Sequence, residues 1–149
     1  MKTINEVKDY LKKNFEQGTT CPCCGQFVKA YKRSFNANMA RALALINKLS
    51  NQGKNYIHVQ KEFQKYKLRA TSMDYIQLER WNMIKPDTDN NGYWTITSIG
   101  ISFLENKIQV ADFVLVYNNK TYAYSSKNIY LKDIIYKKFS YEELFNFKK

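Results

Sequence analysis

Apolar residues recur at helical spacing near the start of the chain. Val7, Leu11 and Phe15 are four residues apart, so they fall on one face of a helix. Thr3 and Glu6 have the spacing of a capping box, in which each side chain hydrogen-bonds the backbone N–H of the other residue. This pattern predicts an amphipathic helix that begins after Thr3.

Two more helices are predicted in the middle of the chain. The first is Met39–Leu49, which Asn36 or Asn38 would cap. Its apolar positions repeat with helical period and form one stripe: Met39, Ala42, Leu43, Ile46 and Leu49. The second is Lys61–Lys67, whose Phe63 and Tyr66 would face inward.

Shorter segments alternate with the two-residue period of a strand. Phe27–Phe35 alternates imperfectly and predicts a short or edge strand, and Tyr56–Val59 predicts another short strand. Near the end of the chain, Asn118-Asn119-Lys120 separates Phe113–Tyr117 from Thr121–Ser125, which predicts a β-hairpin.

The last segments add one strand and one helix. Ile129–Leu131 is a third strand candidate beside the hairpin. Ser140 and Glu143 form a second capping box, which predicts a final short helix through Leu144.

The stretch Thr71–Thr97 contains the most ordered pattern of the chain. Tyr75, Leu78 and Trp81 share one side of a helix, and Asn82 follows, a residue that tolerates a left-handed stop. A strand, a polar loop over residues 87–92 and a return strand Tyr93–Thr97 come next. Asn91-Gly92 in the loop is a hairpin turn signal.

The segment LERWNMI resembles the L-x-x-x-G-L-I ending of a winged-helix recognition helix, with Asn82 for Gly and Met83 for Leu. Residues Thr97–Leu104 resemble the T-x-x-G-x-x-F-L helix that often closes such domains, with Thr97 as its N-cap. The resemblance covers residues 36–106. It implies an α+β fold with a winged helix-turn-helix core.

Three segments are expected to pack as one body. Residues 1–35 would form the N-terminal helix, a CPCCG knuckle and a strand, and residues 36–106 the winged-helix domain. Residues 107–149 would form a C-terminal β-hairpin or meander with a short helix.

A net charge of +11 favours a polyanionic partner, although the three segments carry similar shares of +4, +3 and +4. The densest basic run is expected to contact phosphates: Lys61, Lys65, Lys67 and Arg69. Gln77 and Arg80, opposite the buried side of the recognition helix, have the chemistry to bind base edges in the major groove. An evenly solvated basic surface is the alternative interpretation of the charge.

Other residues on the same face favour a protein partner instead. Met73 and Ile76 cannot hydrogen-bond to a base, and exposed apolar side chains are typical of protein-binding surfaces. The loop tip carries Asp87 and Asp89 and no basic residue, although a phosphate-gripping wing would carry Lys or Arg. The second hypothesis is therefore an interaction module for a host or virion protein.

Cys21 and Cys24 have C-x2-C spacing, with Pro after the first and Gly after the second. This resembles a zinc knuckle, in which a tight turn directs two thiolates at one metal ion. A structural zinc site needs four ligands, and no second pair follows. His58 with a carboxylate or with Cys23 is one completion, and a second chain in a homodimer is another. The turn without metal is the third hypothesis, and for His58 a structural hydrogen bond is the more common role.

Other features bound the class of protein. A single His, the lack of a Gly-rich phosphate loop and the lack of clustered carboxylates argue against an enzyme. The sequence contains no run of eighteen apolar residues, so no membrane-spanning helix is expected. Three cysteines and the lack of a visible secretory signal are typical of a cytoplasmic protein.

The combination of CPCCGQFVK, YIHV, LERWNMI and GYWTIT resembles a group of small, uncharacterised bacteriophage and bacterial proteins. This resemblance implies a bacteriophage setting, so the expected cytoplasm would be that of a bacterial cell, such as a phage-infected one. A DNA-binding factor similar to a transcription regulator is the function expected first.

Overall fold

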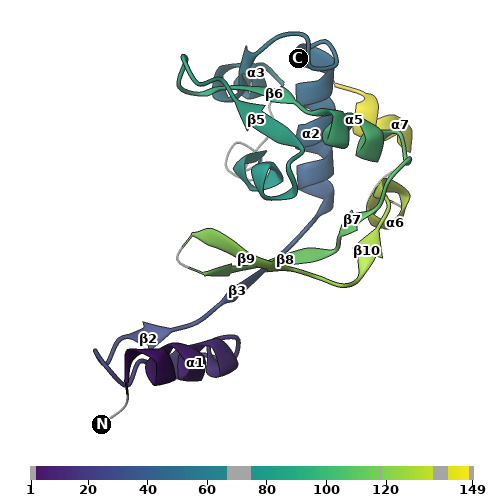
Figure 1. Cartoon of the computed structure of the whole chain (residues 1–149). Coiled ribbons are helices and arrows are strands. Elements are labelled where there is room, and N and C mark those ends of the chain that lie inside the picture. Colours follow the sequence, from purple (N-terminus) through teal and green to yellow (C-terminus); the bar gives the residue numbers. More distant parts are fainter. Residues whose placement is uncertain (1–2, 67–74, 118, 136–140, 148–149) are drawn as a thin grey trace. The chain divides into compact units, whose positions relative to one another are not determined.

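The structure is a computed structural model that describes residues 3–66, 75–117, 119–135 and 141–147 (Figure 1). It contains both helices and sheets, as the predicted α+β class requires. The chain divides into two compact units. The first unit comprises Met1–Ser34 and Phe113–Ser125, and the second comprises Phe35–Asp112 and Ser126–Lys149. The two units differ from the three segments expected from the sequence, because the C-terminal hairpin belongs to the same unit as the N-terminal helix.

The first unit begins with helix α1, Ile4–Asn14. The Thr3 side chain accepts a hydrogen bond from the Glu6 N–H at 3.2 Å, which confirms the predicted helix start. Strands β1, Thr19–Thr20, and β2, Phe27–Val28, pair antiparallel after the helix. A small apolar core joins these elements, with Val7 and Leu11 packed against four buried residues: Phe15, Cys21, Val28 and Ala30.

Three more strands complete the first unit: β3, Tyr31–Ser34, β8, Phe113–Tyr117, and β9, Lys120–Tyr124. They form one antiparallel sheet in the order β3-β8-β9. The predicted strand over residues 27–35 is divided between β2 and β3. At the division, the Ala30 N–H donates to the Phe15 carbonyl oxygen at 2.8 Å instead of to a neighbouring strand. The predicted hairpin is confirmed to within one residue.

Helix α2, Ala37–Leu49, is the centre of the second unit (Figure 1). The Asn36 side chain caps it by accepting the Met39 N–H at 2.9 Å. The predicted stripe is buried as far as Ile46, and Ala44 and Leu45 beside it are buried too. Burial on more than one face places α2 inside the unit, where it packs against η1, β6, α5, α6 and α7.

A small sheet lies beside α2. Its strands are β4, Ile57–His58, β5, Ile84–Pro86, and β6, Tyr93–Ile96, in the order β4-β6-β5. Helix α3, Val59–Lys65, follows β4 directly and begins two residues before the predicted Lys61. The earlier start has a physical reason, because His58 acts as the N-cap of α3.

Five further described elements complete the second unit, and the three helices among them pack against α2. They are α5, Ser98–Leu104, β7, Val110–Ala111, β10, Asn128–Ile129, α6, Leu131–Ile135, and α7, Tyr141–Phe145. β10 pairs with β7 rather than with the hairpin, and Leu131 begins a helix instead of ending a strand. The Ser140 cap lies outside the described residues. Within the described ranges, no helix is both long and apolar enough to cross a membrane.

Candidate nucleic-acid interface

The candidate interface is built on η1, a 3₁₀ helix over Tyr75–Trp81. A 3₁₀ helix has three residues per turn, so residues three apart lie in line. Tyr75, Leu78 and Trp81 have this spacing and are buried, as the sequence pattern predicts. The Trp81 Nε1–H donates to the Ala111 carbonyl oxygen at 2.8 Å and fixes the end of the helix.

In its described part, the helix predicted from Thr71 is therefore a 3₁₀ helix and not an α-helix. Residues 67–74 lie outside the described residues, and Met73, Lys67 and Arg69 are among them. A wheel of 100° per residue and a threefold 3₁₀ repeat both place positions 75, 78 and 81 together. The spacing of apolar residues in the sequence therefore cannot distinguish an α-helix from a 3₁₀ helix here.

Asn82 ends η1 in the left-handed conformation that the sequence predicts, with φ of 59°. The Met83 N–H then bonds back to the Leu78 carbonyl oxygen at 3.2 Å. Thr97 holds the same corner from the other side, because its Oγ1–H donates to the Asn82 carbonyl oxygen at 2.6 Å. The stop of η1 and the start of α5 are thus tied together.

Gln77 and Arg80, three residues apart on η1, lie together on the half-buried side of the helix. The Arg80 Nε–H donates to the Gln77 Oε1 at 2.6 Å. This bond orients the planar guanidinium and leaves the Gln77 amide as a donor. Ile76 lies beside the pair with 38% of its surface exposed. The structure thus brings together one polar pair and one exposed apolar side chain.

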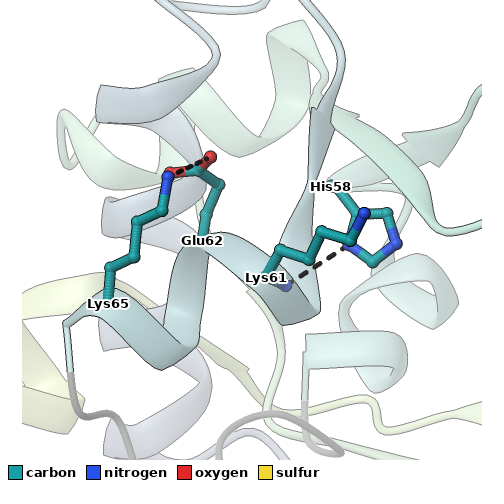
Figure 2. A network of polar contacts seen from close by, with 4 residues as sticks. All are labelled: His58, Lys61, Glu62 and Lys65. Atoms are coloured by element: carbon teal, nitrogen blue, oxygen red, sulfur yellow. Dashed lines mark hydrogen bonds and ion pairs between the residues drawn. The ribbon is translucent and has the colours of Figure 1, made fainter.

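Helix α3 contributes the described part of the basic run (Figure 2). Lys65 Nζ lies 3.3 Å from Glu62 Oε1, so its charge is partly neutralised. The Lys61 side chain is exposed, while its backbone N–H donates to His58 Nδ1 at 3.3 Å. His58 therefore has the structural hydrogen bond that is its more common role.

The loop between β5 and β6 is organised by one carboxylate. Asp87 Oδ1 accepts the Asp89 N–H at 3.0 Å, and Oδ2 accepts the Asn90 side-chain amide at 3.1 Å. The Asp89 backbone bond and then the Asn90 side-chain bond lower the pKa of Asp87, because they favour the ionised form. At neutral pH the loop tip is therefore negatively charged, as its sequence predicts.

A polar cavity of about 360 Å³ lies between η1 and this loop. Tyr75 and Ile76 line it from η1, Asp87 and Gly92 from the loop, and His58 from β4. A carboxylate in this position opposes the approach of phosphate. The exposed apolar residue beside an acid makes this cavity suitable for a protein contact.

The cysteine knuckle belongs to the first unit. The Gly25 N–H donates to the Cys21 carbonyl oxygen at 2.9 Å, and Gly25 has the positive φ of 76° that the turn requires. Backbone N–H groups of Cys24 and then Cys23 bond the Cys21 sulfur and lower its pKa, against the smaller opposing effect of burial. Stabilisation of a thiolate suits a metal ligand.

The ligand set of the knuckle is incomplete within the described residues. Cys21 is buried, and Cys23 and Cys24 are exposed. The described residues contain no group of three or more His, Cys, Asp or Glu side chains that could hold a metal ion. His58 belongs to the second unit and caps α3 there. Within the part of the chain that the structure describes, Cys21 and Cys24 therefore offer two sulfur donors, fewer than the four that a structural zinc site needs.

The first unit contains a cluster that the sequence does not reveal. Tyr117 and Tyr122 of the hairpin lie against Phe15, at the end of α1, with ring centroids 5.6 Å and 4.7 Å away. About one hundred residues separate these partners along the chain, so no local pattern predicts their contact. The only sequence feature that points to this cluster is the set of tyrosines in the hairpin.

Comparison with known proteins identifies no relative, because no protein-family model, curated protein or solved structure matches this chain.

Proposed function

We propose that residues 36–106 form a winged helix that binds duplex nucleic acid without catalysing a reaction. The observation that carries the proposal is the order of elements α2, β4, α3, η1, β5 and β6 together with the sheet order β4-β6-β5. A winged-helix scaffold has the same order of parts: a helix, a short strand, two more helices and a β-hairpin that forms the wing. The net charge of +11 supports a polyanionic partner.

Each part has a role in this proposal. Lys61 and Lys65 on α3 contact phosphates, with Lys67 and Arg69 continuing the basic run beyond the described helix. Arg80, oriented by Gln77, binds a base edge as a donor. The acidic wing tip does not attract phosphate, so in this proposal α3 supplies most of the electrostatic attraction.

The decisive experiment measures the anisotropy of a fluorescent DNA duplex between ~50 and ~200 mM salt. Wild-type protein binds more weakly as salt rises. Lys61→Ala and Arg80→Ala weaken binding, and each lost phosphate contact reduces the salt slope by about 0.9. Lys132→Ala removes an exposed charge on α6 and serves as the control with unchanged binding. Undetectable binding at the lowest salt ends the proposal.

A protein-interaction function is the second candidate, favoured by one observation. Ile76 is exposed beside Asp87 in the cavity between η1 and the wing, and Met73 precedes it in the sequence. This surface fits a host or virion protein with an apolar and basic contact. Ile76→Asp then abolishes capture of that partner, whereas Ile99→Asp on α5, with 39% exposure, retains it. Equal capture by both variants argues against the candidate.

We also propose that Cys21 and Cys24 bind zinc, with two more thiolates from a second copy of the chain. The support is the turn, whose N–H groups stabilise a thiolate at Cys21. Native mass spectrometry then detects a dimer with one zinc ion, and a chelator or Cys24→Ser converts it to monomer. Cys23→Ser and His58→Ala distinguish the other ligand sets. A metal-free monomer under all conditions contradicts the proposal.

A further inference from the structure

A pocket of about 270 Å³ lies in the first unit between α1 and the β8–β9 hairpin. Leu11, Phe15 and Val28 form its apolar part, and Tyr117 and Tyr122 line it from the hairpin. This volume is at the lower end of ligand-binding sites and suits one flat aromatic group. A base pair within a duplex cannot enter such a pocket, whereas an unpaired base can.

The aromatic residues of the pocket are held in place and still accessible. Phe15 is buried and contacts both tyrosines edge-to-face, at interplanar angles of 87° for Tyr117 and 84° for Tyr122. Tyr117 is 39% exposed and Tyr122 is 48% exposed. Tyrosine rings that are held by a neighbouring ring and remain partly exposed are suitable platforms for stacking, since every nucleobase has a π-face.

Two lysines border the same pocket. Lys8 and Lys12 lie one helical turn apart on α1 and line the pocket with the apolar groups. Long lysine stems pack on apolar surface while their ammonium groups extend into solvent. Among the described residues, no carboxylate lies within ion-pair distance of either lysine. Two positive charges therefore lie one turn apart beside an aromatic pocket.

The charge of the whole unit agrees with an anionic ligand. The first unit carries eight basic and three acidic residues, whereas the second carries sixteen and ten over more than twice the length. None of the three acidic residues, Glu6, Asp9 and Glu16, lines the pocket. The positive charge that is evenly spread along the sequence is thus densest on this unit.

We propose that this pocket binds single-stranded nucleic acid, with one base against Tyr117 and Tyr122 and the flanking phosphates on Lys8 and Lys12. A stacked base accounts for the aromatic lining, and the phosphates account for the lysines at its edge. An acidic peptide would use the lysines but has no need of two partly exposed tyrosine rings. The site is separate from the winged helix and goes beyond its proposed duplex binding.

The test measures the anisotropy of labelled single strands of about twelve nucleotides, one of deoxythymidine and one of uridine. Tyr122→Ala weakens binding at least about fivefold, the lower end of base–aromatic stacking. Tyr122→Phe keeps the ring and retains affinity. Tyr124→Ala is the matched control, because Tyr124 lies on the same strand with 54% exposure and does not line the pocket. The two strands show whether DNA or RNA is preferred.

A second set of variants, the charge arm of the test, changes lysines of helix α1. Lys8→Gln with Lys12→Gln reduces the single-strand salt slope by about 1.4, which corresponds to two phosphate contacts. Lys13→Gln on α1 leaves the slope unchanged, because Lys13 is exposed and does not line the pocket. These surface substitutions preserve the fold, so the charge arm tests the site even when Tyr122→Ala destabilises the unit.

Two outcomes overturn the proposal: wild-type protein that does not bind either strand, and pocket variants that bind as wild type does. Lys61→Ala and Arg80→Ala separate this site from the winged helix. They weaken duplex binding and leave single-strand binding intact. Loss of single-strand binding in these variants, with the pocket variants unaffected, contradicts the pocket and leaves the proposed duplex function standing.

Discussion

Thr97 Oγ1 donates a hydrogen bond to the Asn82 carbonyl oxygen at 2.6 Å and accepts one from the Gly100 N–H at 3.2 Å. One hydroxyl thus closes η1 and opens α5. Both helices pack against α2, so this side chain joins the end of η1 to the start of α5 beside the core.

Thr97→Ala removes the N-cap of α5 and the bond to Asn82. Loss of a Thr cap costs about 0.5–2 kcal/mol of stability. We expect a decrease of that size in the free energy of unfolding, measured by urea denaturation. Thr97→Ser keeps the hydroxyl and retains most of the stability. Equal loss in the two variants contradicts the role of the hydroxyl.

Asn82 adopts φ of 59°, a region that most L-residues avoid at a cost of roughly 1–2 kcal/mol. Asn82→Ala therefore lowers the unfolding free energy by about 1 kcal/mol. Asn82→Gly is tolerated, because glycine has no Cβ to strain. Thermal and urea unfolding of the two variants provide the comparison, and a stable Ala variant would falsify the strain argument.

Gly100 lies in α5 where helix propensity alone favours alanine. A Cβ at this position would lie 2.6 Å from the Met83 carbonyl oxygen and 2.7 Å from Ile96 Cγ1. Backbone cannot move aside cheaply, so Gly100→Ala destabilises the fold by about 1–3 kcal/mol. The sign is the informative result, because an exposed helix would gain up to about 1 kcal/mol from the same change. Urea denaturation measures it.

Asp87 makes the folded state less stable as the pH falls into the acid range. Its pKa is lower in the folded state than in the unfolded chain, so the contribution is complete above about pH 4. It is lost as pH falls through the folded pKa, since the protonated group no longer holds the Asp89 and Asn90 donors as strongly. Asp87→Asn is less stable than wild type at pH 7, and the difference shrinks in acid. A constant difference down to pH ~2 contradicts this assignment.

Local patterns were sufficient for several elements. Thr3 and Glu6 predict the start of α1, Asn36 is one of two predicted caps of α2, and Asn82 is the predicted left-handed stop. These features depend on side chains and backbone bonds close together in the sequence, which the order of residues specifies directly. The predicted hairpin is confirmed because its turn joins two neighbouring segments, and the buried repeat of η1 is confirmed because its apolar positions have one period.

Other features required long-range information. The early start of α3 is a separate case: the His58 ring nitrogen caps the helix through a local bond, which the strand-like pattern of Tyr56–Val59 conceals. The strand predicted at Ile129–Leu131 instead pairs Asn128–Ile129 with β7, since pairing depends on which edge is available in space. The Gln77–Arg80 bond is local, but its half-buried setting comes from neighbouring elements.

By itself, the sequence determined the helix caps, the turns, the alternation of strands and a positive charge that favours polyanions. Only the tertiary structure decided that the hairpin Phe113–Tyr124 joins α1, and that Lys8 and Lys12 border a tyrosine-lined pocket. The physical reason is that caps and turns use bonds between near neighbours. A pocket depends on side chains that only the folded chain brings together.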